Sequence, residues 1–291
     1  MKALWSLAFG VLLGCGAVPQ VQAKPKPKWE LGIGHAEGQA AHYAGSNHYY
    51  FRSGTLPYGI YRLEQVDLGS TPKLYVPILE NVYLEPALGF EFPVEAEGTD
   101  VTPPAAASDP DAELVRDKNY TRRGMANQQA LLGIGAKLVW YANEHVTASV
   151  SFLLKNTLGA GFHYVGVTLR PGGAIDLFER ESPYALGVGL SVEFGDQGFN
   201  EYYYGVPDAD ALSDRPAYDA PGGLIAWHDE LFASAQVTEQ FKVFGAVYHN
   251  HLRESVIRDS PLVVTKENRG FAWGFTYMFM HSSETVARVS K

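Results

Sequence analysis

The 291-residue sequence contains a single cysteine, Cys15, close to its N-terminus. One thiol cannot form an intramolecular disulfide, so the chain has no disulfide framework, and zinc sites made of several thiolates are excluded. Basic residues are also scarce, because 23 Lys and Arg face 32 Asp and Glu and the net charge is −9. This acidic balance predicts no nucleic-acid partner, since such proteins carry a basic face.

Long hydrophobic runs are missing beyond the N-terminus. No segment after residue 23 reaches the roughly 18 consecutive apolar residues that a transmembrane helix requires. Apolar residues at helical spacing are also nearly absent there. The sequence therefore predicts neither a transmembrane helix nor a helical fold after residue 23.

The N-terminus has the layout of a secretory signal peptide. Lys2 precedes a short apolar run at residues 3–13, and small residues form a cleavage site at Ala23. This pattern predicts a signal peptide at 1–23 that is cut between Ala23 and Lys24. The chain is therefore expected to be exported.

Two other interpretations of the N-terminus stay open. The apolar stretch could remain uncleaved, and the residues LLGC at 12–15 resemble a lipoprotein signal ending at Cys15. We favour cleavage after Ala23, because the small residues of that site are well placed behind the apolar run. Cleavage there also removes the only cysteine.

The stretch SPYALGVGLSVEF, at residues 182–194, alternates between large apolar and small or charged residues. Successive side chains of a strand point to opposite faces, so one face of this strand is apolar along its whole length. The same alternation recurs in several later and earlier segments. The apolar face of this strand consists of Tyr184, Leu186, Val188, Leu190, Val192 and Phe194.

An alternating strand of this kind can face either lipid or the core of a soluble β-sandwich. The opposite faces are rich in small residues, such as Gly133, Gly135, Gly187 and Gly189, whereas a water-facing sheet would carry more Lys, Glu and Gln. Aromatic residues gather near the predicted strand ends, where membrane barrels have aromatic girdles. We therefore predict that the apolar faces meet lipid, and a soluble sandwich is the alternative.

The predicted fold is an all-β, up-and-down antiparallel transmembrane β-barrel of 10–12 strands, of which twelve is the number we favour. A single barrel domain is predicted at 24–291. Two long polar stretches, a Pro/Ala/Asp-rich one at 93–124 and a Tyr-rich one at 195–223, are predicted to be loops. The expected location is the outer membrane of a Gram-negative type of envelope.

Several motifs in the second half of the chain resemble those of a known family. They include Tyr203, Tyr204 and Gly205 in the Tyr-rich loop, Asp259, Ser260 and Pro261 further on, and the aromatic strand that ends at Phe279. Near the N-terminus, Gly45–Ser46 and Pro57–Tyr58 have the form of an opening motif. Together these stretches resemble the MipA/OmpV family of outer-membrane proteins over nearly the whole mature chain.

The resemblance implies an outer-membrane β-barrel that lies in lipid and has no catalytic residues or cofactors. The name-giving member binds a murein transglycosylase and a murein synthase, so the resemblance implies a scaffold for murein-remodelling enzymes in the cell envelope. The chain departs from common outer-membrane proteins by continuing past Phe279 to Lys291. The alternative function is a narrow channel for small solutes, which the small residues of the inner face favour. Oligomeric state stays open.

Two polar groups of residues suggest chemistry, but neither predicts a catalytic or metal site. His249 and His251 share one face of a strand and could bind one metal ion, with Glu254 nearby. We favour solvated histidines at a strand end, and predict no metal and no cofactor. Asp259 and Ser260 look like part of a hydrolytic triad, but no histidine has a spacing that makes it the base. We therefore predict no enzyme activity.

Overall fold

The computed structural model is mostly β-sheet. It describes residues 26–63, 66–68, 73–74, 76–98, 118–159, 161–179 and 182–286. Among these residues there is one α-helix, α2 (Gln197–Tyr204), and none of the described helices is long and apolar enough to cross a membrane. The predicted cleavage site at Ala23 and Lys24 lies outside the described residues.

One large sheet has the strand order β5-β4-β3-β2-β16-β15-β14-β13-β12-β11-β10-β7-β6. All pairs of neighbouring strands in this sheet are antiparallel. The long strands are β2 (Trp29–Ala41), β3 (Tyr49–Arg62), β7 (Val82–Glu91), β10 (Ala130–Tyr141), β11 (Val146–Leu158), β12 (Tyr164–Asp176), β13 (Tyr184–Gly195), β14 (Gly223–Gln236), β15 (Phe241–His251) and β16 (Glu267–His281). The short ones are β4 (Val66–Leu68), β5 (Lys73–Leu74) and β6 (Val76–Leu79).

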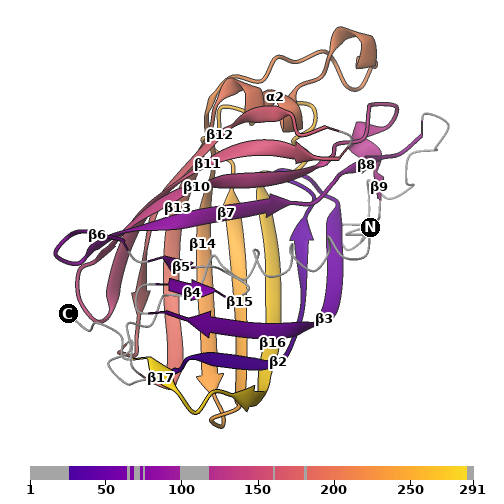
Figure 1. Cartoon of the computed structure of the whole chain (residues 1–291). Helices are drawn as coiled ribbons and strands as arrows, with labels where there is room; N and C mark the ends of the chain where they lie inside the picture. The colour runs from indigo at the N-terminus through magenta and orange to yellow at the C-terminus, as the bar shows by residue number, and fades with distance from the viewer. Residues whose placement is uncertain are drawn as a thin grey trace.

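The chain runs up and down through neighbouring strands, and its last long strand, β16, pairs with its first, β2 (Figure 1). The sheet curls into a barrel but does not close, because no ladder joins its edge strands, β5 and β6, in the described part of the chain. The predicted all-β, up-and-down antiparallel architecture is confirmed. The predicted count of twelve strands is not confirmed, since there is no closed circuit in which to count them.

Strand β3 contacts the segment after β7 at the end of the barrel that carries α2. The Tyr50 hydroxyl on β3 donates a hydrogen bond to the carbonyl oxygen of Pro93, just beyond β7. The Tyr50 ring also lies 5.4 Å from the ring of Phe92. The two sides of the opening therefore meet at this end of the barrel.

The two ends of the barrel differ in their connections. Long segments meet at the end that carries α2, which we call the capped end; their described parts are 42–48, 92–98, 118–129, 196–222 and 252–266. Short turns lie at the other end, the turn end, and their described parts are 80–81, 142–145, 177–179, 182–183 and 237–240. There β1 (Lys26–Pro27) also pairs with β17 (Thr285–Val286), and Figure 1 shows β17 opposite α2. Membrane barrels carry long loops outside and short turns on the periplasmic side, so we expect the capped end to face outward.

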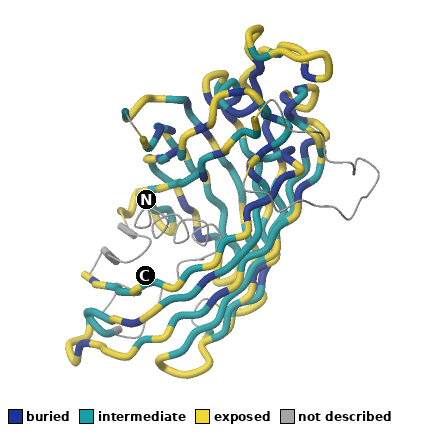
Figure 2. Tube along the Cα trace, turned by 90° about the vertical axis from the view of Figure 1, so that its right-hand side faces the viewer, coloured by how far each residue is buried: buried dark blue, intermediate teal, exposed yellow. Residues whose placement is uncertain are grey.

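The buried core lies in the cap, and Figure 2 shows buried residues gathered around α2 while most strand residues are partly or fully exposed. The helix begins where the Asp196 side chain accepts a hydrogen bond from the backbone N–H of Phe199, at 2.9 Å. Tyr203 and Tyr204 on α2 are only 3% and 2% exposed. They pack with residues of all four capped-end segments, including Tyr43, Val94, Met125, Leu252, Ile257 and Leu262.

The outer face of the barrel is apolar and exposed. On β13, Val188 is 53% exposed, and Tyr184, Leu190 and Phe194 are exposed too, while Leu186 and Val192 are half-buried. Neighbouring strands present the same kind of surface, as at Ile134, Leu138, Val150, Phe152, Leu154, Leu231, Val247, Trp273 and Tyr277. An apolar surface of this extent marks contact with something other than water, and we expect that to be lipid.

The inward glycines that the sequence singled out differ in the space around them. A Cβ on Gly135 would collide with the carbonyl oxygen of Phe152, and one on Gly187 with that of Ile175. These two glycines therefore permit a close approach of neighbouring strands. Gly189 has room, because the nearest atom to its Cβ position is the Gly173 carbonyl oxygen at 3.7 Å.

We predict that Val188→Arg destabilises the inserted barrel by about 2–4 kcal/mol, because an arginine in the middle of a lipid-facing strand loses its hydration. Gly189→Ser, on the opposite face of the same strand, should cost much less, since that position has space. Urea unfolding of the refolded protein in lipid bilayers measures both changes. Equal losses would contradict a lipid-facing Val188.

The cap tyrosines are held in their neutral form. Burial raises the pKa of Tyr202 to about 12 and raises the pKa values of Tyr203 and Tyr204 well above the ordinary value. A tyrosine ionises near about pH 10 in an unfolded chain, so the folded cap retains protons that the unfolded cap loses. The stability that these tyrosines contribute is thus full below about pH 10 and is lost as the pH rises from there toward the folded pKa.

We predict that the cap unfolds at alkaline pH before the barrel does. Tyrosine absorbance and near-UV circular dichroism should report one transition between about pH 10 and 12, while the far-UV strand signal persists. Tyr204→Phe, which cannot ionise, should move this transition to higher pH. Tyr184→Phe, on the outer face, is the matched control and should leave it in place; a shift of equal size in both would contradict the assignment to the cap.

Candidate functional site

The motif residues identified from the sequence come together in the cap. The Ser260 hydroxyl donates a hydrogen bond to the carbonyl oxygen of Tyr204, at 2.7 Å, and so joins the two motifs. Gly205 ends α2, and its N–H donates to the carbonyl oxygen of Glu201 at 3.0 Å. Pro261 is half-buried beside Ser260. These residues determine the shape of the cap, whereas the apolar residues of β13 lie on the outer face of the sheet.

The pair Asp259 and Ser260 is arranged as a turn. The Ser260 side chain is buried, and its oxygen also accepts the backbone N–H of Leu262 at 3.2 Å. Asp259 is exposed and lies 3.6 Å from the Nε of Arg258. Both hydrogen-bonding functions of the serine are therefore used within the cap.

Two buried arginines, which sequence reasoning did not single out, dock the predicted loops onto each other. Arg122, from the first loop, donates to the carbonyl oxygen of Tyr203 at 3.1 Å, and burial lowers the pKa of its guanidinium. Arg215, from the second loop, donates to the carbonyl oxygens of Thr121 at 2.9 Å, Arg123 at 2.8 Å and Asp210 at 2.7 Å. The loops 93–124 and 195–223 thus form one body in their described parts.

An exposed ion pair adds to this docking. Arg123 donates from Nη2 to both carboxylate oxygens of Asp214, each at 2.7 Å. The hydrogen bond from Arg123 lowers the pKa of the Asp214 carboxyl. Because the aspartate is exposed, we assign this pair a small share of the cap's stability.

The opening motif is held by β16. The Asn268 side chain is fully buried; it accepts the N–H of Gly45 at 2.6 Å and donates to the carbonyl oxygen of Ser46 at 2.7 Å. Gly45 has a φ of 93°, a left-handed conformation that favours glycine. The 42–48 segment is thereby fixed to the opposite end of the sequence.

Charged residues occupy inward positions below the cap. Arg170 on β12 and His228 on β14 both contact Glu193 on β13, at 3.2 Å and 3.1 Å. The other ring nitrogen of His228 lies 2.7 Å from the Asn250 side-chain oxygen. A second ion pair joins Lys155 to Glu91, and the Lys155 Nζ lies 5.6 Å from the Phe199 ring of the cap. The interior next to the cap is thus filled by paired charges.

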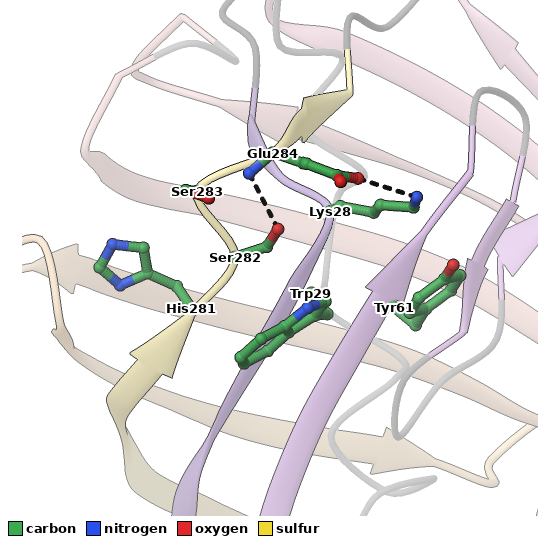
Figure 3. A pocket seen from close by; sticks show the side chains of 7 residues that line it. All are labelled: Lys28, Trp29, Tyr61, His281, Ser282, Ser283 and Glu284. Atoms are coloured by element: carbon green, nitrogen blue, oxygen red, sulfur yellow. Dashed lines mark hydrogen bonds and ion pairs between the residues drawn. The ribbon is translucent and has the colours of Figure 1, made fainter.

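A shallow pocket lies at the turn end, where the first and last described segments meet (Figure 3). Its volume is about 580 Å³, and Lys28, Trp29, Tyr61, His281, Ser282, Ser283 and Glu284 line it. The Lys28 ammonium lies 3.0 Å from the Glu284 carboxylate, which raises the pKa of the lysine. Figure 3 shows that the Ser282 hydroxyl accepts the N–H of Glu284, at 2.9 Å. The pocket has both polar and aromatic walls.

The histidines singled out in the sequence lie on the outer face near the capped end of β15. His249 and His251 share that face as predicted, but the carboxylate beside them belongs to Asp229 on β14. The Asp229 oxygen is 2.6 Å from the Nε2 of His251. Sequence reasoning named Glu254 instead, because only the register of β14 and β15 brings Asp229 opposite His249.

Comparison with solved structures finds outer-membrane proteins at low similarity. The NanC porin is 9% identical with a TM-score of 0.40, covering 84% of this chain and 98% of its own. The COG4313 outer membrane channel from Pseudomonas putida F1 is 12% identical with a TM-score of 0.40, covering 91% and 100%. At these scores the likeness carries no conclusion about function. No curated protein sequence matches the chain.

The sequence profile of one family matches most of the chain. The family is described as MltA-interacting protein MipA, and the match covers residues 31–279. The matched region includes every long strand from β3 to β15, both sequence motifs of the cap and most of β16. It therefore agrees with the resemblance seen in the sequence and with the up-and-down antiparallel sheet. The chain belongs to the MltA-interacting protein MipA family, and it is an outer-membrane β-barrel protein.

Proposed function

We propose that this protein is a non-enzymatic scaffold that binds murein-remodelling enzymes at its turn end. The observation that carries the proposal is the difference between the two ends. One end is filled by a packed cap, and the other presents an open surface where both ends of the described chain meet. The family's description as an MltA-interacting protein names the kind of partner. The resemblance seen in the sequence implies that this partner is a murein transglycosylase, together with a murein synthase.

The cap supports a role other than transport. The loops 93–124 and 195–223 are docked through buried Arg122 and Arg215, and tyrosines of α2 fill the space between them. Below them the ion pairs Arg170–Glu193 and Lys155–Glu91 occupy the interior. A solute would have to displace this whole layer to pass.

The turn end supports a role in protein binding. Short turns of outer-membrane barrels lie on the periplasmic side, where murein is found. The β1–β17 pair and the Lys28–Glu284 ion pair order the surface, and the aromatic rings of Trp29 and Tyr61 lie beside them. Protein interfaces are enriched in aromatic residues within a polar rim. Export through a signal peptide at 1–23 is part of the same proposal.

We predict that Tyr61→Ala weakens binding of a purified MltA-type transglycosylase by at least about tenfold, because tyrosines at the centre of an interface dominate its binding energy. The measurement is surface plasmon resonance with the protein in nanodiscs. Tyr164→Ala removes an exposed tyrosine at the capped end, where the side chain is 60% exposed against 40% for Tyr61, and is the control. If Tyr164→Ala abolished binding and Tyr61→Ala did not, the proposal would be contradicted and the partner would bind at the capped end.

The second candidate function is a narrow channel for small solutes, favoured by the space around the inward Gly189. Gly189→Trp is the discriminating variant, whereas Gly187→Trp would collide with Phe232 and disturb the strand. Under the scaffold proposal, we predict no steady conductance of the protein in planar bilayers and unchanged enzyme binding in Gly189→Trp. Conductance that Gly189→Trp abolishes, with no detectable enzyme binding, would favour the channel.

A further inference from the structure

A polar patch interrupts the apolar outer face near the capped end of β14, β15 and β16. Strand pairing aligns it in two outward rows. Trp227, His251 and Glu267 form the upper row; Asp229, His249 and Arg269 form the lower row; Leu231, Val247 and Phe271 begin the apolar surface below them. The patch therefore lies at the upper edge of the surface that we expect lipid to cover.

Three metal-ligating side chains come together in this patch: Asp229 and His249 of the lower row and His251 of the upper row. One ligand atom from each of Asp229, His249 and His251 lies within 4.8 Å of the other two. The Asp229 carboxylate is 2.6 Å from the Nε2 of His251 and 3.9 Å from the Nδ1 of His249. Ligands about 2.0–2.1 Å from a tetrahedral zinc ion are about 3.3–3.5 Å apart. Small side-chain rotations would thus bring all three to ligand distance.

A second observation points to a missing ligand on His249. Its Nε2 is buried and has no hydrogen-bond partner among the described residues. The nearest carboxylate, that of Glu267, is 3.6 Å away, which is too far for a hydrogen bond. Arg253 donates a hydrogen bond to the other carboxylate oxygen of Glu267, at 2.5 Å. Buried polar atoms usually have hydrogen-bond partners, so this ring nitrogen without one is available to a ligand such as a cation.

The backbone makes the arrangement rigid. His249 and His251 are two residues apart on one strand, so their side chains leave the sheet on the same face. Asp229 is the direct partner of His249 on the neighbouring strand. The three ligands therefore come from hydrogen-bonded strands, and their spacing does not depend on a loop.

We propose that Asp229, His249 and His251 bind a divalent transition-metal ion, with zinc as the best fit, and that the ion ties β14 to β15 at the outer rim. Two imidazoles and one carboxylate are a ligand set that suits zinc, and they leave a fourth position open. The site lies at the capped end, away from the proposed enzyme-binding surface. Its presence is therefore independent of the scaffold function.

The experiment uses the full mature chain without a histidine tag, refolded in detergent and stripped of metal with a chelator. Zinc titration by isothermal calorimetry should give one equivalent of bound ion. Cobalt titration should give the visible absorption of a four-coordinate ion with nitrogen and oxygen ligands. Zinc should also raise the thermal midpoint of unfolding, because it binds the folded strands only.

Matched variants separate this site from other histidines and carboxylates. His251→Gln and Asp229→Asn should each lower zinc affinity by at least about tenfold, since loss of an outer partner alone costs 10- to 100-fold. His281→Gln, an exposed histidine at the turn end, and Glu254→Gln, which the sequence placed near the pair, should bind zinc as the wild type does. Heat-dependent gel mobility checks that each variant has folded, and Asp229→Asn keeps the side-chain shape if His251→Gln does not fold. No zinc uptake by the wild type, or equal affinity in wild type and Asp229→Asn, would overturn the proposal.

Discussion

The backbone ladder between neighbouring strands is the constraint on which the rest of this molecule depends. Lipid offers no hydrogen bonds to a peptide group, so a strand that crosses a bilayer has to pair with its neighbours. Pairing with period two then assigns each side chain to one of two faces. On β13 this puts Val188 outside and Gly189 inside, and on β15 it puts both histidines outside.

The positions of the cap segments also depend on this ladder. Its four segments start and finish at strand ends, so the ladder determines where each one begins. Within the cap, main-chain carbonyl oxygens that have no strand partner accept from buried side chains, as those of Tyr203 and Tyr204 do from Arg122 and Ser260. This satisfies polar backbone in a layer that is otherwise aromatic. Among the described residues, the large cluster of buried hydrophobic side chains therefore lies in the cap and not between the strands.

Alternation along one strand can be recognised from sequence, because it depends only on neighbouring residues. That was sufficient for the strand at 184–194 and for the aromatic strand that includes Phe279, which continues to His281. Partners across strands cannot be recognised in this way. Asp229 joins His249 only through the register of β14 and β15, and Arg215 meets Thr121 only after both loops fold back. The tight glycines show the same limit, since Gly135 and Gly189 look alike in sequence but differ in the space around them.

The hydrogen bonds that Asn268 makes with Gly45 and Ser46 have a consequence for the biogenesis of the protein. Asn268 lies 223 residues after Gly45, on the last long strand of the chain. That same strand supplies the partner of β2. The hydrogen bonds that join segment 42–48 to β16 can consequently form only after nearly the entire polypeptide has been synthesised. Completion of the polypeptide and completion of the cap are thereby coupled, and a prematurely terminated chain would lack both this anchor of the cap and the partner of its first long strand.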